Sequence, residues 1–150
     1  MSYSLRAIVG DYQALTEVDL PSSAKVVRLQ ENLGLIPLTD ELYGQLADLY
    51  PSAEKDDSLK ELTDLTPAIV EWMRSLSKNR MLAYLEAEYY DGAGEQGAAV
   101  WNDSNLLPHP RPGCSVNLAL QALGVAAKPP DDEFDTVGLG RHRRPERWLT

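Results

Sequence analysis

The chain has 150 residues, of which 43% are hydrophobic and 25% charged, and its formal net charge is -9 at pH 7. This length fits one domain that buries a sizeable core without the help of a metal or a disulfide. The acidic balance argues against nucleic-acid binding by the main body, because it repels phosphate backbones. It favours solubility or attraction of a basic partner.

The compartment is predicted from the cysteine content and the N-terminus. Cys114 is the only cysteine, which excludes an intrachain disulfide and fits a reducing compartment. The first residues lack the apolar stretch of a signal peptide, and no apolar run approaches the roughly 20 residues of a membrane helix. We therefore expect a cytoplasmic protein without a membrane segment.

The first half of the chain combines short strands with one clear helix. Alternation or short apolar runs predict strands at residues 3–9, 25–29 and 35–36. Thr39 is expected to cap a helix that ends before Pro51, because its hydroxyl can accept from a free backbone N–H. Residues 52–63 are polar and predict a solvated connection, with Leu59 and Leu62 as its apolar anchors.

The second half contains a predicted β-hairpin over residues 80–101. A helix precedes it, with Pro67 at the first helical position, where its missing N–H costs nothing. Residues 91–94 (DGAG) supply the positive-φ positions of a turn. The returning strand over residues 97–101 has small side chains, which leave room for a helix to pack across it. Ser115 is expected to cap a third helix.

These elements predict an α+β fold. We expect a mostly antiparallel sheet of about five strands, with the 80–101 hairpin at its centre and three or four helices packed against it. Residues 1–150 should form a single domain, with residues 128–150 as a C-terminal segment docked on the body. That segment carries five acidic and five basic residues, so the whole net charge lies in residues 1–127.

Candidate binding residues lie on the hairpin. They alternate with apolar residues along the first strand or follow the turn, and they are Tyr84, Glu86, Glu88, Tyr90, Glu95 and Gln96. Glutamates two apart on a strand share a face, with Cβ atoms about 7 Å apart, and could serve a hard cation or a paired-carboxylate hydrolase. No further ligand stands at a recognisable spacing, so a solvated strand face is the simpler interpretation. No metal or other cofactor is predicted.

A second group of candidates lies in the C-terminal segment. The basic cluster comprises Arg141, His142, Arg143 and Arg144. Its simpler interpretation is docking, in which apolar residues anchor the segment while the arginines pair with the acidic body. The alternative is contact with nucleic acid.

Nucleophilic catalysis has little support in the sequence. Cys114 precedes a helix cap, which can lower a thiol pKa. Its pairing with His109 rests only on closeness in sequence, and a lone cysteine is more often a small buried apolar group.

Two stretches, EAEYYDGAGEQGAAVW and DEFDTVGLGRHRRPERW, resemble segments of small bacterial proteins that have no assigned activity. Some small acidic proteins of this general type are immunity proteins of bacterial toxin systems. The resemblance covers about forty residues and implies no residue roles.

The leading hypothesis is a non-enzymatic binding protein, an inhibitor or immunity-type partner of a basic protein. Tyrosines on the hairpin would supply interface anchors. One alternative is a small hydrolase or metal-dependent enzyme that uses the hairpin carboxylates. The other is nucleic-acid contact through the basic C-terminal segment.

Overall fold

A computed structural model describes residues 2–149 as a mixed α and β structure. The strands of this part are β1 (Ser2–Asp11), β2 (Val27–Arg28), β3 (Leu33–Pro37), β4 (Met81–Tyr90), β5 (Ala93–Asn102) and β6 (Asn105–Leu106). The helices are α1 (Tyr12–Thr16), α2 (Asp40–Leu49), α3 (Pro67–Leu76), α4 (Val116–Ala122) and α5 (Glu133–Val137). A short 3-10 helix, η1 (Asp57–Leu59), lies within the polar connection, and two more, η2 (Leu139–Arg141) and η3 (Pro145–Leu149), follow α5.

All six strands belong to one sheet, in the order β2-β3-β1-β4-β5-β6. Every neighbouring pair is antiparallel. The predicted α+β fold with an antiparallel sheet is therefore confirmed. The additional strand is β6, a two-residue return after a tight turn at Asp103 and Ser104, both of which have positive φ.

The helix starts follow the predicted capping residues. The Thr39 hydroxyl accepts from the Leu42 N–H at 3.3 Å, and Ser115 accepts from the Leu118 N–H at 3.2 Å. Each bond satisfies one of the backbone donors that a helix leaves free in its first turn. Local chemistry thus determines where these helices begin.

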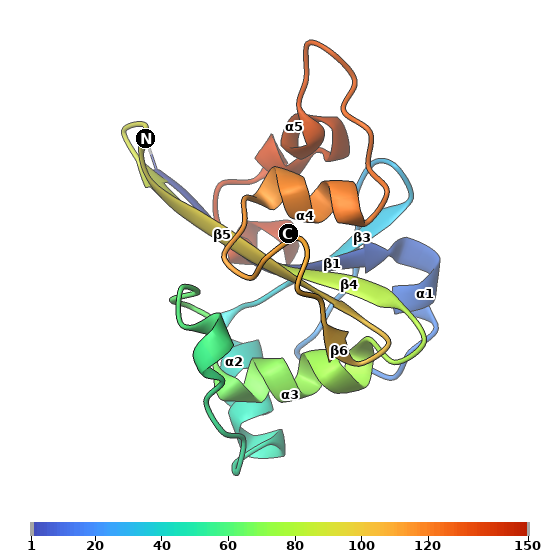
Figure 1. The fold of residues 1–150 in the computed structure, drawn as a ribbon, viewed down its shortest axis with the longest axis vertical. Coiled ribbons are helices and arrows are strands. Elements are labelled where there is room, and N and C mark those ends of the chain that lie inside the picture. The colour runs from blue at the N-terminus through green and yellow to red at the C-terminus, as the bar shows by residue number, and fades with distance from the viewer. Residues whose placement is uncertain (1, 150) are drawn as a thin grey trace.

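Helices cover both faces of the sheet, so the molecule has three layers (Figure 1). On one face, buried Ile8, Tyr84 and Trp101 pack with residues of α2 and α3. On the other, Leu85 and Val100 pack with residues of α4, α5 and the C-terminal segment. β4 is therefore covered on both sides over residues 82–87, and exposed residues appear only toward its end.

The β4–β5 hairpin turns through Asp91 and Gly92, which both have left-handed φ, of 49° and 81°. Tyr90 therefore pairs with Ala93, and the predicted four-residue turn is shorter by two residues. The start of β1 pairs with the end of β4, so the tip of the hairpin is part of a three-stranded ribbon. We call residues 2–4 and 88–96 the arm, which extends beyond the helices of both layers (Figure 1).

The C-terminal segment lies on the α4 side of the sheet. Val137, Leu139 and Trp148 are buried in that core cluster. The backbone N–H of Ser4, at the edge of β1, donates to the Arg143 carbonyl at 2.7 Å. Among residues 2–149, no helix has the length and apolar character needed to cross a membrane.

Candidate binding site

The structure separates the hairpin candidates into two groups. Tyr84 is fully buried and Glu86 is 7% exposed, whereas Tyr90 is 69% exposed. Glu88, Glu95 and Gln96 are exposed as well and lie in the arm. The interpretation of one solvated strand face is therefore wrong for Tyr84 and Glu86.

The buried carboxylate of Glu86 is surrounded by hydrogen-bond donors. Its Oε2 accepts from the N–H and the hydroxyl of Thr63, both at 3.0 Å. Its Oε1 accepts from the Asp64 N–H at 3.1 Å and from the Tyr84 hydroxyl at 2.9 Å. Four donors balance the charge within a buried site. This carboxylate joins the sheet to the connection before α3 and is a structural group.

That connection covers the face predicted to be open. Leu59 and Leu62 are each 5% exposed, so the predicted apolar anchors do pack inward. A Cβ at Gly97 would lie 2.7 Å from the Leu62 Cδ2, so glycine permits this close approach. The prediction failed because a polar segment was expected to be solvated, whereas its backbone N–H groups bind Glu86.

Tyr43 also contacts the connection that binds Glu86. Its hydroxyl donates to the Asp64 carbonyl at 2.8 Å, and burial raises the pKa of Tyr43 to about 12. Burial also raises the pKa of Tyr84 well above its ordinary value. Both hydroxyls stay protonated and act as donors at neutral pH.

Beyond Glu86, the arm presents two faces of different chemistry. Glu88 on β4 stands directly opposite Glu95 on β5, so both carboxylates lie on one face together with Tyr90. Neither glutamate forms an ion pair within residues 2–149. Tyr89 and Gln96 point to the other face, which is turned toward α4 and α5.

The basic cluster is attached to the body by groups other than carboxylates. The Arg141 guanidinium donates to the Arg28 carbonyl at 2.9 Å and lies over the Trp148 ring. His142 contacts the same ring edge-on, with centroids 4.7 Å apart. Arg144 donates to the Ser2 hydroxyl at 3.3 Å. The expected pairing with acidic residues is therefore wrong for Arg141 and Arg144.

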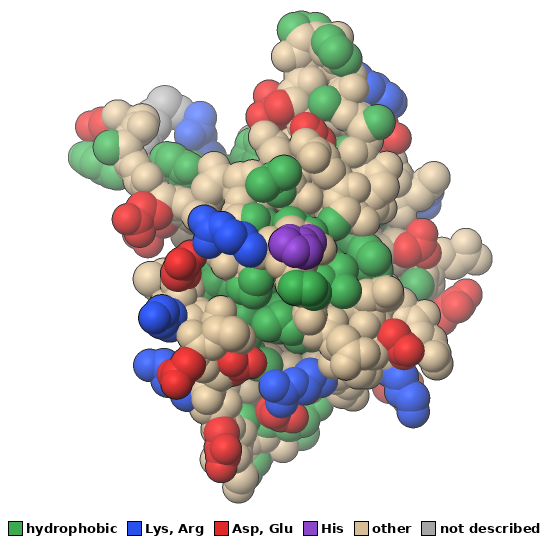
Figure 2. All heavy atoms as spheres, viewed as in Figure 1, with side chains coloured by type: hydrophobic (Ala, Val, Ile, Leu, Met, Phe, Trp, Pro, Cys, Tyr) green, Lys and Arg blue, Asp and Glu red, His purple; other side chains and the backbone are tan. Residues whose placement is uncertain are grey.

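A pocket of about 390 Å³ lies between the inner face of the arm and the α4–α5 layer. Figure 2 shows the molecule hollowed between the arm and the lobe that contains α5. We call this cavity the arm pocket. Its lining comes from β1, β4, β5, α4, α5 and the C-terminal segment: Tyr3, Ala87, Tyr89, Gln96, Val116, Asn117, Asp132, Phe134, Gly140 and Arg143.

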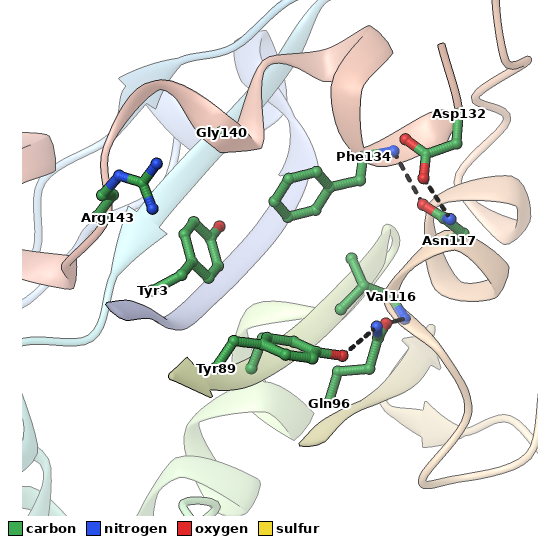
Figure 3. Close-up of a pocket in the computed structure, with 10 residues that line it drawn as sticks. Tyr3, Tyr89, Gln96, Val116, Asn117, Asp132, Phe134, Gly140 and Arg143 are labelled. Carbon is green, nitrogen blue, oxygen red and sulfur yellow. Dashed lines mark hydrogen bonds between the residues drawn. The ribbon is translucent and has the colours of Figure 1, made fainter. Parts of the chain in front are cut away.

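Aromatic rings form much of the wall of the arm pocket (Figure 3). Tyr3 and Phe134 meet edge to face, with ring centroids 5.6 Å apart and an interplanar angle of 66°. The Tyr3 hydroxyl donates to the Leu139 carbonyl at 2.9 Å, and burial raises the pKa of Tyr3 above its ordinary value. The ring is thereby held in place by the C-terminal segment.

Two amide side chains in the arm pocket have a defined orientation (Figure 3). Gln96 accepts from the Val116 N–H at 2.8 Å and donates to the Tyr89 hydroxyl at 2.8 Å. Asn117 accepts from the Phe134 N–H at 2.9 Å and donates to Asp132 at 3.0 Å. Since a backbone N–H can only donate, the oxygen of each amide must face it.

Asp132 has a local role as the cap of α5. One of its carboxylate oxygens accepts from the Asp135 N–H at 2.9 Å, and the other accepts from Asn117. These hydrogen bonds, the Asp135 backbone N–H foremost, hold the pKa of Asp132 below its ordinary value. The residue is ionised at neutral pH, with both oxygens engaged.

The structure does not bring the candidate catalytic residues Cys114 and His109 into a hydrogen-bonded pair. Cys114 is buried, its thiol donates to the Ala98 carbonyl at 3.6 Å, and burial raises its pKa. His109 is exposed. Within the described part of the chain, no cluster of three His, Cys, Asp or Glu residues could hold a metal ion. Cys114 here has the role of a small buried side chain at the β5 edge.

Sequence reasoning found only Gln96 and Arg143 among the residues that line the arm pocket. It named Tyr89 only as an interface anchor on the hairpin, and it missed Tyr3, Asn117, Asp132 and Phe134. The available signals were indirect: Asp132 stands at a helix start, and Tyr89 alternates with the candidates on β4. Nothing local in the sequence places these stretches together.

Comparison of the chain with protein-family models, curated proteins and solved structures found no match. The resemblance of the hairpin and the C-terminal stretch to small bacterial proteins therefore stays a prediction.

Proposed function

We propose that this chain is a non-enzymatic binding protein whose partner is a basic protein, in the manner of an inhibitor or immunity protein. The observation that carries the proposal is the cross-strand pair Glu88 and Glu95. Like charges directly opposite each other destabilise a sheet. A lysine or arginine from a partner would relieve this repulsion.

The surroundings of the pair suit an interface. Tyr90 lies on the same face and is 69% exposed, and tyrosine is among the residues that most often anchor protein interfaces. The net charge of -9 would steer a basic partner toward the molecule. The lone cysteine agrees with binding in the reducing cytoplasm.

The hydrolase alternative lacks a comparable observation. The Glu86 oxygens are engaged by four donors, and Glu88 and Glu95 lie on the face of the arm opposite to the arm pocket. The nucleic-acid alternative would rely on a basic cluster of which Arg141 and Arg144 are already engaged by the body.

The test is affinity capture from an extract of the native host with two matched double variants. Glu88→Gln with Glu95→Gln removes two negative charges from the arm. Glu17→Gln with Asp19→Asn removes two charges from exposed positions after α1. We expect the wild type and the control to retain one dominant basic protein in a salt-sensitive manner, and the arm variant to lose it.

The stability of the arm variant separates lost binding from lost folding. Removal of the like-charge pair should stabilise the free protein slightly, by about 0.2–1 kcal/mol. Capture of no partner at low and moderate salt would contradict the proposal. Equal retention by the arm variant and the control would contradict it too.

A further inference from the structure

The arm pocket has the size and walls of a small-molecule site. Its volume of about 390 Å³ falls within the roughly 300–1,000 Å³ typical of ligand pockets. Tyr3 and Phe134 provide ring surfaces, and Ala87 and Val116 add apolar area. Such walls suit a flat apolar group.

The unused hydrogen-bonding capacity in the arm pocket consists mainly of donors. The Tyr89 hydroxyl accepts from Gln96, which leaves its own proton free to donate. The amide nitrogens of Gln96 and Asn117 each use one hydrogen in the bonds described and retain a second. A ligand rich in acceptors would satisfy these groups.

Arg143 adds a positive charge to the same pocket. It is exposed, and its guanidinium forms no hydrogen bond or ion pair with the rest of the described chain. In Figure 3, it lies at the opposite end of the pocket from Asp132. The one acid of the lining, Asp132, has both oxygens engaged and stands away from this end.

We propose that the arm pocket binds a small aromatic carboxylate. The ligand ring packs against the joined ring surfaces of Tyr3 and Phe134, and its carboxylate pairs with the Arg143 guanidinium. Acceptors elsewhere on the ligand meet the free donors of Tyr89, Gln96 and Asn117. A guanidinium matches a carboxylate with two parallel hydrogen bonds. The site is distinct from the proposed protein-binding face, because Glu88 and Glu95 lie on the other side of the arm.

Titration of the amide NMR spectrum tests the proposal with three probes of similar shape. Phenylacetate is the anion, phenylacetamide its neutral analogue and phenethylamine a cationic one. We expect phenylacetate to produce saturable shifts at Gln96, Val116, Asn117 and Phe134, with a weaker response to the amide and none to the amine. The absence of saturable shifts with phenylacetate, or equal binding of the amine, would overturn the proposal.

Two matched variants in the C-terminal segment test whether Arg143 is the charge that binds the carboxylate. Arg143→Gln should weaken phenylacetate binding about tenfold. Arg144→Gln removes the same charge one residue away, from a side chain outside the pocket lining, and should leave affinity unchanged. Equal loss in both variants would indicate general electrostatic attraction and overturn the proposal.

Two further variants test whether the ligand occupies the arm pocket and whether its binding is independent of the Glu88–Glu95 face. Ala87→Leu fills the pocket and should abolish the shifts, while the remaining resonances report that the fold is retained. The Glu88→Gln, Glu95→Gln variant should bind phenylacetate as the wild type does. Binding by Ala87→Leu at wild-type affinity would place the ligand elsewhere and contradict the proposal.

Discussion

Replacement of Glu86 by glutamine tests whether the buried carboxylate holds the connection before α3 against the sheet. The change keeps the shape of the side chain and removes its charge. In the native protein each oxygen accepts two hydrogen bonds, from Thr63 on one side and from Asp64 and Tyr84 on the other. An amide has one acceptor oxygen, so its nitrogen must face two donors.

The magnitude follows from which donors can adapt. If the amide oxygen keeps the two Thr63 bonds, the Tyr84 hydroxyl can rotate and accept, but the Asp64 N–H cannot. A buried unsatisfied donor costs about 1–3 kcal/mol, and a hydrogen bond to a charged group contributes about 1.5–3 kcal/mol. We expect Glu86→Gln to lower the free energy of unfolding by about 2–4 kcal/mol, a large share of the about 5–15 kcal/mol typical of a domain.

Urea unfolding monitored by tryptophan fluorescence measures this free energy. The control is Glu88→Gln, the same substitution two residues along the same strand face, where the side chain is exposed. Because it removes one charge of the Glu88–Glu95 pair, it should not destabilise the protein and should raise stability by at most about 1 kcal/mol. Protease should also cleave the 52–64 connection faster in Glu86→Gln. A loss below about 0.5 kcal/mol in Glu86→Gln, or one equal to that of Glu88→Gln, would refute a structural role.

Three further outcomes are expected. Gly44→Ala, at an exposed position of α2 where an added Cβ meets nothing within 4 Å, should stabilise the protein by about 0.5–1 kcal/mol in the same urea assay; a destabilised variant would show that α2 is not formed as described. Because the folded-state pKa of Tyr43 is about 12 and its ordinary value 10.0, the unfolded chain loses this proton first, so the free energy of unfolding should fall as pH rises from about 10 to 12. Tyr43→Phe should fall less steeply over that interval, and an identical slope would contradict the assignment. Cys114 should react slowly with dithionitrobenzoate in the native protein and rapidly in urea, since burial shields the thiol and raises its pKa; equal rates would contradict its burial.

Features set by neighbouring residues could be predicted from the sequence. Thr39 and Ser115 cap their helices because the donor and acceptor lie within three residues of each other. The β4–β5 hairpin was predictable because the turn-forming Asp91 and Gly92 stand between an alternating segment and a short apolar one. Such chemistry does not depend on the rest of the fold.

The burial of Glu86 could not be predicted in the same way. Alternation shows which side chains share a strand face, but it does not show what covers that face. Here the cover is a polar segment, and the donors that satisfy Glu86 include the backbone N–H groups of Thr63 and Asp64. Every residue has such a group, so the sequence carries no signal of it.

The arm combines two features that folding stability alone does not explain. Its outer face sets Glu88 opposite Glu95, although an unlike pair or a neutral one would strengthen the hairpin. Its inner face leaves a cavity with spare donors and an Arg143 guanidinium that no side chain of residues 2–149 pairs, although larger apolar side chains would fill that space. Natural sequences tend to depart from local optima where a site must meet another molecule. The outer face carries two negative charges and the inner face one positive charge. We therefore expect a cationic group to bind beside Glu88 and Glu95 and an anionic group to bind beside Arg143, so the two faces should take different ligands.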